Sequence, residues 1–280
     1  MVGQEKLILK INSLTLDTFP HTLLLVGERG SGKHLIVDYI GNHFGFEVID
    51  VTDDISLELI DTITLRIEPK IYLIDGTLLT EKKENVLLKF LEEPVKNSFI
   101  IILCEAPQQL LPTIINRCRR WDLAKYSKLD LSQFLDDPNG IKAPILLDDV
   151  ANTPGQIIEF QKQDLTNIIG LCNTIIDKIA GANCQNTLTI TNKIAFNHEE
   201  EKYDFDCFVR CMLYSIRKRI VENNSLQNSF AFVRTKQLES DRYIHNINLI
   251  NLFNTYLIDM KGIYEGKGHI VEGRITIRYN

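Results

Sequence analysis

A glycine-rich loop with a single lysine follows a short apolar run near the start of the chain. The loop, residues 27–34, reads GERGSGKH, and the run before it is Thr22–Val26. Glycines let consecutive backbone N–H groups turn towards an anion, and the Lys33 ammonium can reach the outer phosphates of a nucleotide. The pattern predicts a phosphate-binding loop between a strand and a helix, the alternative being a glycine-rich turn with an exposed lysine.

The last position of this loop departs from the usual pattern. Phosphate loops normally end in Ser or Thr, whose hydroxyl binds magnesium, whereas this chain has His34. We therefore expect a loop that holds a nucleotide but is poorly equipped to cleave it.

A second informative segment is the apolar run that ends at Asp75. An acid at the end of such a strand is expected to bind the magnesium of the nucleotide. A hydrolysing ATPase normally has glutamate next, which polarises the attacking water, but here Gly76 follows and no carboxylate appears before Glu81. The alternative is that Asp75 only caps the helix that follows.

Residues 1–125 alternate between strand-like and helix-like patterns. Apolar strands separated by helices are typical of a parallel sheet covered on both faces, which binds ligands beyond the carboxyl ends of its strands. A helix is expected over Glu81–Leu91, where apolar residues recur at helical spacing. The expected strands are Leu23–Val26, Glu47–Val51, Ile71–Ile74, Phe99–Cys104 and Arg119–Leu123.

The rest of the chain reads as helical. Residues 126–163 contain short helical segments separated by turns, and longer helices are expected over Leu165–Ile179, Phe205–Val221 and Tyr243–Met260. The tail after Lys261 is a short strand, a disordered end or a segment foreign to the natural protein. The expected fold class is an α/β domain, then a small helical unit, then an all-α domain.

Composition excludes several classes of protein. Of 280 residues 44% are hydrophobic and 24% charged, with a formal net charge of −6, which argues against coating nucleic acid by bulk electrostatics. No apolar run approaches the roughly 18 residues of a membrane span and no export signal is present, which favours the cytoplasm. The six cysteines form no CxxC pair, so we expect no zinc and no metal other than a nucleotide-bound magnesium. Any DNA contact needs a local patch, such as Lys82 and Lys83, but a solvated helix face is the stronger interpretation of this pair.

Three further motifs carry a resemblance to a known family. Residues 2–5 read VGQE, residues 87–94 read LLKFLEEP and residues 111–118 read LPTIINRC. In this order and spacing, together with the phosphate loop, they resemble the AAA+ clamp-loader ATPases, most closely the delta-prime type of subunit of DNA polymerase III from a bacterium or its phage.

The resemblance implies an AAA+ nucleotide-binding domain over residues 1–125, a helical lid over 126–163 and a helical collar for oligomerisation over 164–280. Members of that family assemble into a spiral that binds ATP, opens a sliding clamp and places it on primed DNA. The implied partners are therefore other clamp-loader subunits, the sliding clamp and primed DNA, and no membrane.

The resemblance also assigns an arginine to a neighbouring site. Arg117 matches the residue that points into the nucleotide site of the adjacent subunit, where arginine fingers stabilise charge on the transferred phosphate. The alternative is a surface arginine, and Arg119 and Arg120 lie next to it. The VGQ motif matches the family segment beside the adenine.

The chain departs from the family at its own nucleotide site. Besides His34 and Gly76, Gln156 stands where hydrolysing members carry a sensing arginine. Cys104 and Glu105 fall where the family often has small polar residues that sense the γ-phosphate. The cysteine insert that binds zinc in bacterial members is absent. These departures beside Arg117 indicate a division of labour between this subunit and its neighbour.

The prediction is thus a delta-prime-like clamp-loader subunit in DNA replication. Its own site would hydrolyse ATP weakly or not at all, and whether the chain alone is an enzyme stays open. One alternative is a self-sufficient hydrolysing ATPase, which would need a carboxylate from elsewhere, for instance Glu92. Another is a scaffold of the replication machinery that binds no nucleotide. The candidate site residues are Arg117, acting in trans, and, for ATP or ADP with Mg²⁺, Val2, Gly3, Gln4, Gly27, Gly30, Ser31, Gly32, Lys33, His34 and Asp75.

Overall fold

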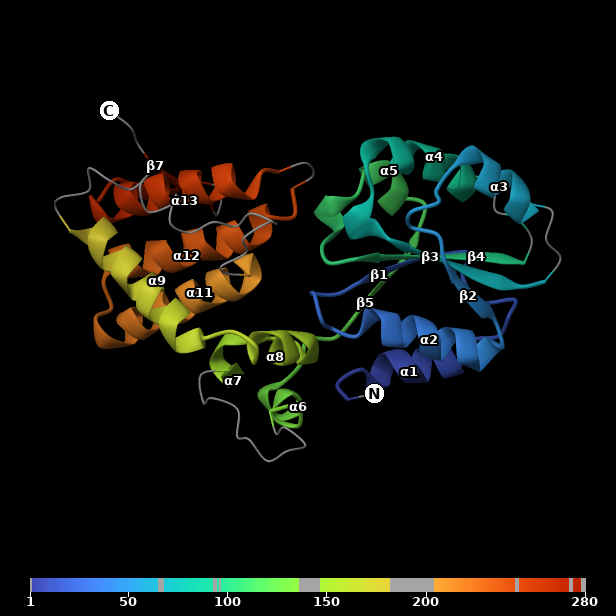
Figure 1. The fold of residues 1–280 in the computed structure, drawn as a ribbon, viewed down its shortest axis with the longest axis horizontal. Coiled ribbons are helices and arrows are strands. Elements are labelled where there is room, and N and C mark those ends of the chain that lie inside the picture. Colours follow the sequence, from blue (N-terminus) through green and yellow to red (C-terminus); the bar gives the residue numbers. More distant parts are fainter. Residues whose placement is uncertain are drawn as a thin grey trace. The chain divides into compact units, whose positions relative to one another are not determined.

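The computed structural model describes residues 2–64, 68–92, 95, 97–135, 147–181, 204–244, 247–271 and 274–277. The chain divides into two compact units (Figure 1). The first comprises Met1–Gln133 with Thr153–Gly155, and the second Phe134–Asn152 with Gln156–Asn280. The boundaries expected at residues 125 and 163 stay predictions.

The first unit is built on a five-stranded parallel sheet with the strand order β2-β3-β4-β1-β5. Each strand agrees with its predicted range to within one residue at each end. A parallel sheet followed by a helical region is therefore confirmed. The strands are β1 (Thr22–Val26), β2 (Glu47–Asp50), β3 (Lys70–Asp75), β4 (Ser98–Cys104) and β5 (Arg119–Asp122).

Helices cover both faces of this sheet (Figure 1). On one face lie α1 (Glu5–Asn12) and α2 (Lys33–Phe44), and on the other α3 (Leu57–Thr64), α4 (Glu81–Glu92) and α5 (Pro112–Ile115). This double cover explains why the central strands are apolar throughout instead of alternating with polar residues.

The strands supply two apolar cores because successive side chains point to opposite faces. On β4, Ile101 packs in the core with α1 and α2, whereas Ile102 packs in the core with α4 and α5. Trp121 of β5, the single tryptophan of the chain, is buried in the first of these cores. Its fluorescence is therefore a reporter of the fold of this unit.

Shorter elements complete the first unit. They are η1 (Gly76–Leu78), η2 (Pro107–Gln109) and α6 (Lys128–Ser132). In the second unit, α7 (Leu147–Val150) and most of α8 (Pro154–Phe160) precede the longer helices.

Four longer helices of the second unit lie in the part of the chain that the structure describes. They are α9 (Leu165–Ala180), α11 (Phe205–Glu222), α12 (Leu226–Asp241) and α13 (Leu249–Tyr264). Rings from α11 and α13 meet edge to face, since the Phe208 and Phe253 centroids lie 5.5 Å apart at 85°. None of the helices in the described part of the chain is both long and apolar enough to cross a membrane.

Helix α12 was not expected, because its packing face is polar. Arg234 is 5% exposed and its Nε donates to Asp259 Oδ2 on α13 at 2.8 Å. The Thr235 hydroxyl lies 2.9 Å from the Tyr256 hydroxyl, also on α13. Buried polar side chains that satisfy each other leave no apolar period for a sequence search to find.

The prediction for the last long helix was wrong at its start. α13 begins at Leu249, not at Tyr243, because the Asn248 side chain caps it by accepting from Asn251 N at 3.0 Å. Tyr243 and Ile244 belong to the turn after α12.

The expectation of an all-α C-terminal region also needs correction. Strands β6 (Gly268–Val271) and β7 (Arg274–Ile277) pair antiparallel, so the short-strand alternative for the tail is the right one. This two-stranded hairpin contacts α12 and α13, and isolated hairpins need such packing to be stable.

The core of the first unit gives a prediction. Ile102 is fully buried in the middle of β4, so Ile102→Ala should lower the free energy of unfolding by about 2–5 kcal/mol through lost burial and a cavity. Denaturant titration followed by Trp121 fluorescence measures this. The matched control is Leu9→Ala on α1, where the side chain is 69% exposed and little change is expected. Equal stability of the two variants would contradict the burial assigned here.

Candidate functional site

The glycine-rich loop connects β1 to α2, as expected. Gly30 and Gly32 have φ angles of 74° and 85°, in the left-handed region that side chains other than glycine seldom adopt. Helix α2 begins at Lys33, and no side chain in the described part of the structure caps its N-terminus. The first N–H groups of a helix attract anions. The loop therefore has the backbone geometry of an anion site.

The Lys33 side chain folds over this loop. Its Nζ donates to the carbonyls of Gly27 at 2.7 Å and Glu28 at 3.2 Å. Burial lowers the pKa of the Lys33 ammonium, and nearby negative charges, first Glu105 and then Asp75, oppose that lowering. A bound phosphate would stabilise the ammonium further, because an opposite charge favours the charged form.

Hydrogen bonds to three successive loop carbonyls fix the loop from outside. Thr153 Oγ1 donates to Arg29 O at 2.7 Å, Gly155 N to Gly30 O at 2.9 Å, and the Tyr126 hydroxyl to Ser31 O at 2.8 Å. A Cβ at Gly155 would lie 2.4 Å from Gly30 Cα, so this approach requires glycine. These three bonds fix the backbone of the loop in its curved conformation.

The N-terminal segment adjoins the same loop. Gln4 is buried and exchanges two 2.9 Å hydrogen bonds with the backbone of Ala124. A Cβ on Gly3 would lie 3.0 Å from the Tyr126 ring, and Val2 is half-buried. Tyr126, which also holds Ser31, thus brings residues 2–4 next to the loop. It was missed by the sequence analysis because a lone aromatic after a strand carries no specific signal.

Asp75 behaves as a cap in this structure. Its Oδ1 accepts from Thr77 N at 2.9 Å and from the Thr77 hydroxyl at 2.7 Å, which caps η1. Its charge still reaches Lys33. A capping role and a place beside the phosphate loop are therefore both compatible with its position.

The packing around Gly76 explains why no glutamate follows Asp75. A Cβ at Gly76 would lie 2.7 Å from the Leu103 carbonyl and 3.1 Å from Leu110 Cδ2. η1 therefore packs against β4 too closely for any side chain at this position. The sequence has no carboxylate at position 76, and the packing leaves no space for one.

Two other positions that depart from the family pattern have different surroundings. His34 is exposed on the first turn of α2. Gln156 is fully buried, where its Oε1 accepts from Asn152 N at 2.8 Å and its Nε2 donates to Asp206 Oδ2 at 3.2 Å. Gln156 therefore holds its own unit together in place of offering a charge to a ligand.

Arg117 follows α5 and contacts α4. Its Nη1 donates to Thr113 O at 2.9 Å, and its Nη2 lies 2.5 Å from Glu92 Oε1. Glu92, the carboxylate considered for self-sufficient hydrolysis, is thus paired with Arg117. The acids with the largest electrostatic effect on the Lys33 ammonium are instead Glu105 and Asp75.

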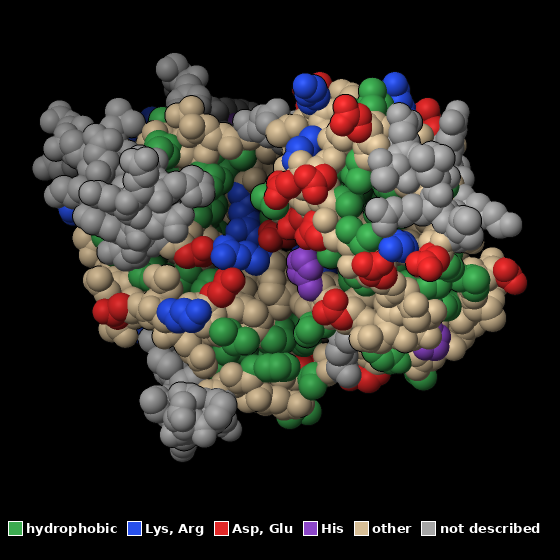
Figure 2. Space-filling view, turned by 45° about the vertical axis from the view of Figure 1, so that its right-hand side comes forward, with side chains coloured by type: hydrophobic (Ala, Val, Ile, Leu, Met, Phe, Trp, Pro, Cys, Tyr) green, Lys and Arg blue, Asp and Glu red, His purple; other side chains and the backbone are tan. Residues whose placement is uncertain are grey.

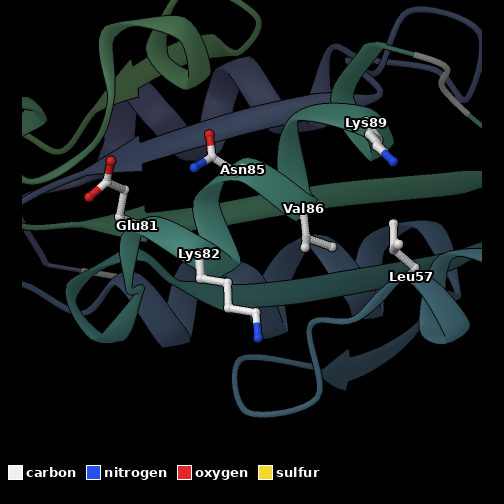
Figure 3. Close-up of a pocket in the computed structure, with 6 residues that line it drawn as sticks. All are labelled: Leu57, Glu81, Lys82, Asn85, Val86 and Lys89. Atoms are coloured by element: carbon white, nitrogen blue, oxygen red, sulfur yellow. The ribbon is translucent and has the colours of Figure 1, made fainter.

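A hollow of about 530 Å³ lies along α3 and α4, away from the phosphate loop (Figure 3). Val86 and Leu57 extend towards one another in it, and Lys82 and Lys89 lie to either side. The lining residues are Leu57, Glu81, Lys82, Asn85, Val86 and Lys89.

The lysines considered for DNA contact differ in their surroundings. Lys83 donates to Thr52 O at 2.8 Å and pairs with Asp53 at 3.8 Å, so its own chain engages it. Lys82 lines the hollow. Acidic and basic side chains are interspersed over the face shown in Figure 2. Within the described ranges, no group of three or more His, Cys, Asp or Glu side chains could hold a metal ion.

The crowding at Gly76 gives a prediction. Gly76→Glu, which would restore the family's carboxylate in sequence, should instead lower the free energy of unfolding by roughly 1–3 kcal/mol, as overpacking does. Denaturation followed by Trp121 fluorescence measures this. Leu78→Glu adds the same charge two residues later, on a side chain that is 61% exposed, and should be tolerated. A Gly76→Glu protein as stable as the unmodified chain would refute the steric argument.

Comparison with known proteins agrees with the motifs. Residues 47–127 match the family described as DNA polymerase III, delta subunit. The delta' subunit of DNA polymerase III from Bacillus subtilis strain 168 is 29% identical over 143 residues, covering 39% of this chain and 43% of that protein. The delta' subunit from Haemophilus influenzae is 39% identical over 54 residues, covering 19% of this chain and 16% of that protein.

Among solved structures, a gamma subunit-related protein of DNA polymerase III from Thermotoga maritima aligns with 94% of this chain and 99% of its own. It has a TM-score of 0.44 and 14% identity. The chain spans less than half the length of the curated relatives that it matches. The resemblance to the delta' subunit of DNA polymerase III, which the motifs indicated, is confirmed for the matched parts of the chain, which include residues 47–127.

Proposed function

We propose that the chain is a delta-prime-like subunit of a clamp loader in DNA replication. It binds ATP or ADP, with Mg²⁺ as the accompanying ion, at the loop of residues 27–34. Its own site hydrolyses ATP weakly or not at all, and Arg117 acts on the nucleotide of a neighbouring subunit. Other clamp-loader subunits, a sliding clamp and primed DNA are its partners, in the cytoplasm.

The observation that carries this proposal is the contrast between the loop and Gly76. The loop keeps its curve, its left-handed glycines and the Lys33 ammonium. After β3, which β4 separates from β1, the position of the catalytic glutamate has no room for a side chain. Such a site suits holding a nucleotide better than cutting it.

The residues present fit a nucleotide with its cation only in part. The helix N-terminus and Lys33 suit the phosphates, and Asp75 can serve the cation. Magnesium, when bound, would supply positive charge that offsets the negative charge of the phosphates. His34 supplies no hydroxyl for it, so we expect nucleotide binding to depend less on magnesium than in a complete phosphate loop.

One observation favours the second candidate, a self-sufficient ATPase. Burial lowers the pKa of Lys33, and the negative charge of Glu105, which follows β4, is the first of those that oppose this lowering. A carboxylate there could polarise water in place of the missing glutamate. A scaffold that binds no nucleotide is favoured by none of the contacts described above.

Nucleotide binding is tested at Lys33. Lys33→Ala removes the ammonium that meets the phosphates and should weaken binding of a fluorescent ATP analogue at least about tenfold, the loss expected for a charge-assisted contact. Equilibrium titration measures it, and Lys89→Ala, an exposed lysine on α4, is the control. No detectable binding by the unmodified chain would favour the scaffold.

The trans role is tested at Arg117 in the complex with which the chain co-purifies. Arg117→Ala should lower hydrolysis at the neighbouring site by about a thousandfold or more, as for other arginine fingers, and so remove that site's share of total turnover. Steady-state ATPase of the complex measures it. Arg119→Ala, an exposed arginine two residues away, should leave turnover unchanged. Full ATPase in the Arg117→Ala complex would end the trans proposal.

A further inference from the structure

The Arg117 guanidinium is held at the surface of the first unit by two acceptors. Nη1 donates to Thr113 O at 2.9 Å and Nη2 to Glu92 Oε1 at 2.5 Å. The backbone of Arg117 is fixed as well, because its carbonyl accepts from the Thr22 hydroxyl at 2.7 Å. Main chain and side chain therefore both have a defined position before any ligand arrives.

Glu92 stands where an acid is unfavourable for its own helix. It is the last residue of α4, and the C-terminus of a helix carries partial negative charge that favours cations. The guanidinium of Arg117 offsets this repulsion. The acid therefore contributes to the position of Arg117 more than to the helix that carries it.

The pair is open to solvent. The side chain of Arg117 is 36% exposed and that of Glu92 is 51% exposed. Exposed ion pairs of this kind bias an equilibrium by no more than about fivefold. A polyphosphate, which carries several negative charges, can therefore compete with the single carboxylate for the guanidinium.

We propose that Glu92 is a positioning residue for Arg117. Its carboxylate is the counterion that holds the guanidinium ready at the surface, and an incoming polyphosphate displaces it. This inference rests on the proposed function, in which that polyphosphate is the nucleotide of a neighbouring subunit. It assigns a role to an acid that takes no part in the chain's own nucleotide site.

The chain offers a matched control pair nearby. Arg120 Nη2 lies 2.5 Å from Asp122 Oδ1 on β5, and their side chains are 48% and 54% exposed. Asp122→Asn therefore removes one carboxylate from a somewhat more exposed arginine pair, without touching Arg117.

The test uses the full chain with isotope-labelled arginine side chains, observed by NMR. Inorganic tripolyphosphate is the probe, and the Arg117 resonance is assigned by its loss in Arg117→Ala. Glu92→Gln should lower the dissociation constant of tripolyphosphate at Arg117 by about threefold to fivefold, since the competing charge is gone. It should also increase the motion of the Arg117 guanidinium without the probe. Asp122→Asn should change neither quantity at Arg117.

Unchanged affinity and motion at Arg117 in Glu92→Gln would overturn the inference. If that variant does not fold, as judged by Trp121 fluorescence, Glu92→Asp replaces it. Its shorter side chain withdraws the carboxylate, so it should show the same change in smaller size, and no change there overturns the inference too. The NMR result is independent of the ATPase of the Arg117→Ala complex, so failure of the trans role and failure of the counterion role are distinguishable.

Discussion

Strand β4 lies between β1 and β3, and its carboxyl end is bonded to the chain on both sides. Gly27 N donates to Cys104 O at 3.0 Å, and Asp75 pairs in register with Leu103. Parallel strands end at the same edge of a sheet, so this pairing gathers Lys33, Asp75 and Glu105 beside the loop. It also presses Gly76 against the Leu103 carbonyl. The pairing of β4 with β1 and β3 therefore assembles the candidate anion site and also leaves no space for a catalytic carboxylate at position 76.

This arrangement is consistent with the proposed division of tasks between this chain and a neighbouring subunit. The first unit has a curved loop, one ammonium and a helix N-terminus that no described side chain caps, and these suit the phosphates of the proposed function. Arg117 follows α5 and lies at the surface of this unit. Its contacts with Glu92 and Thr113 orient the guanidinium there. In the proposed function, holding one nucleotide and acting on another are therefore separate tasks of separate residues.

Much of the first unit could be predicted from sequence because its signals are local. Apolar runs between turns gave all five strands, and the loop before α2 follows from its glycines and lysine. The crowding at Gly76 could not be predicted, because it depends on the approach of η1 to β4. Tyr126 was missed for the same reason: its role comes from neighbours distant in sequence. Helix α12 was missed because its buried face is polar, and Asn248 rather than apolar spacing sets the start of α13.

The central claim is that the isolated chain holds a nucleotide at residues 27–34 without cutting it. The direct measurement is to incubate the chain with labelled ATP, separate bound from free nucleotide, and identify what is retained. The account predicts that close to one equivalent stays bound and is still ATP after many minutes. Retention of nothing, or rapid conversion of the bound ATP to ADP, would contradict it.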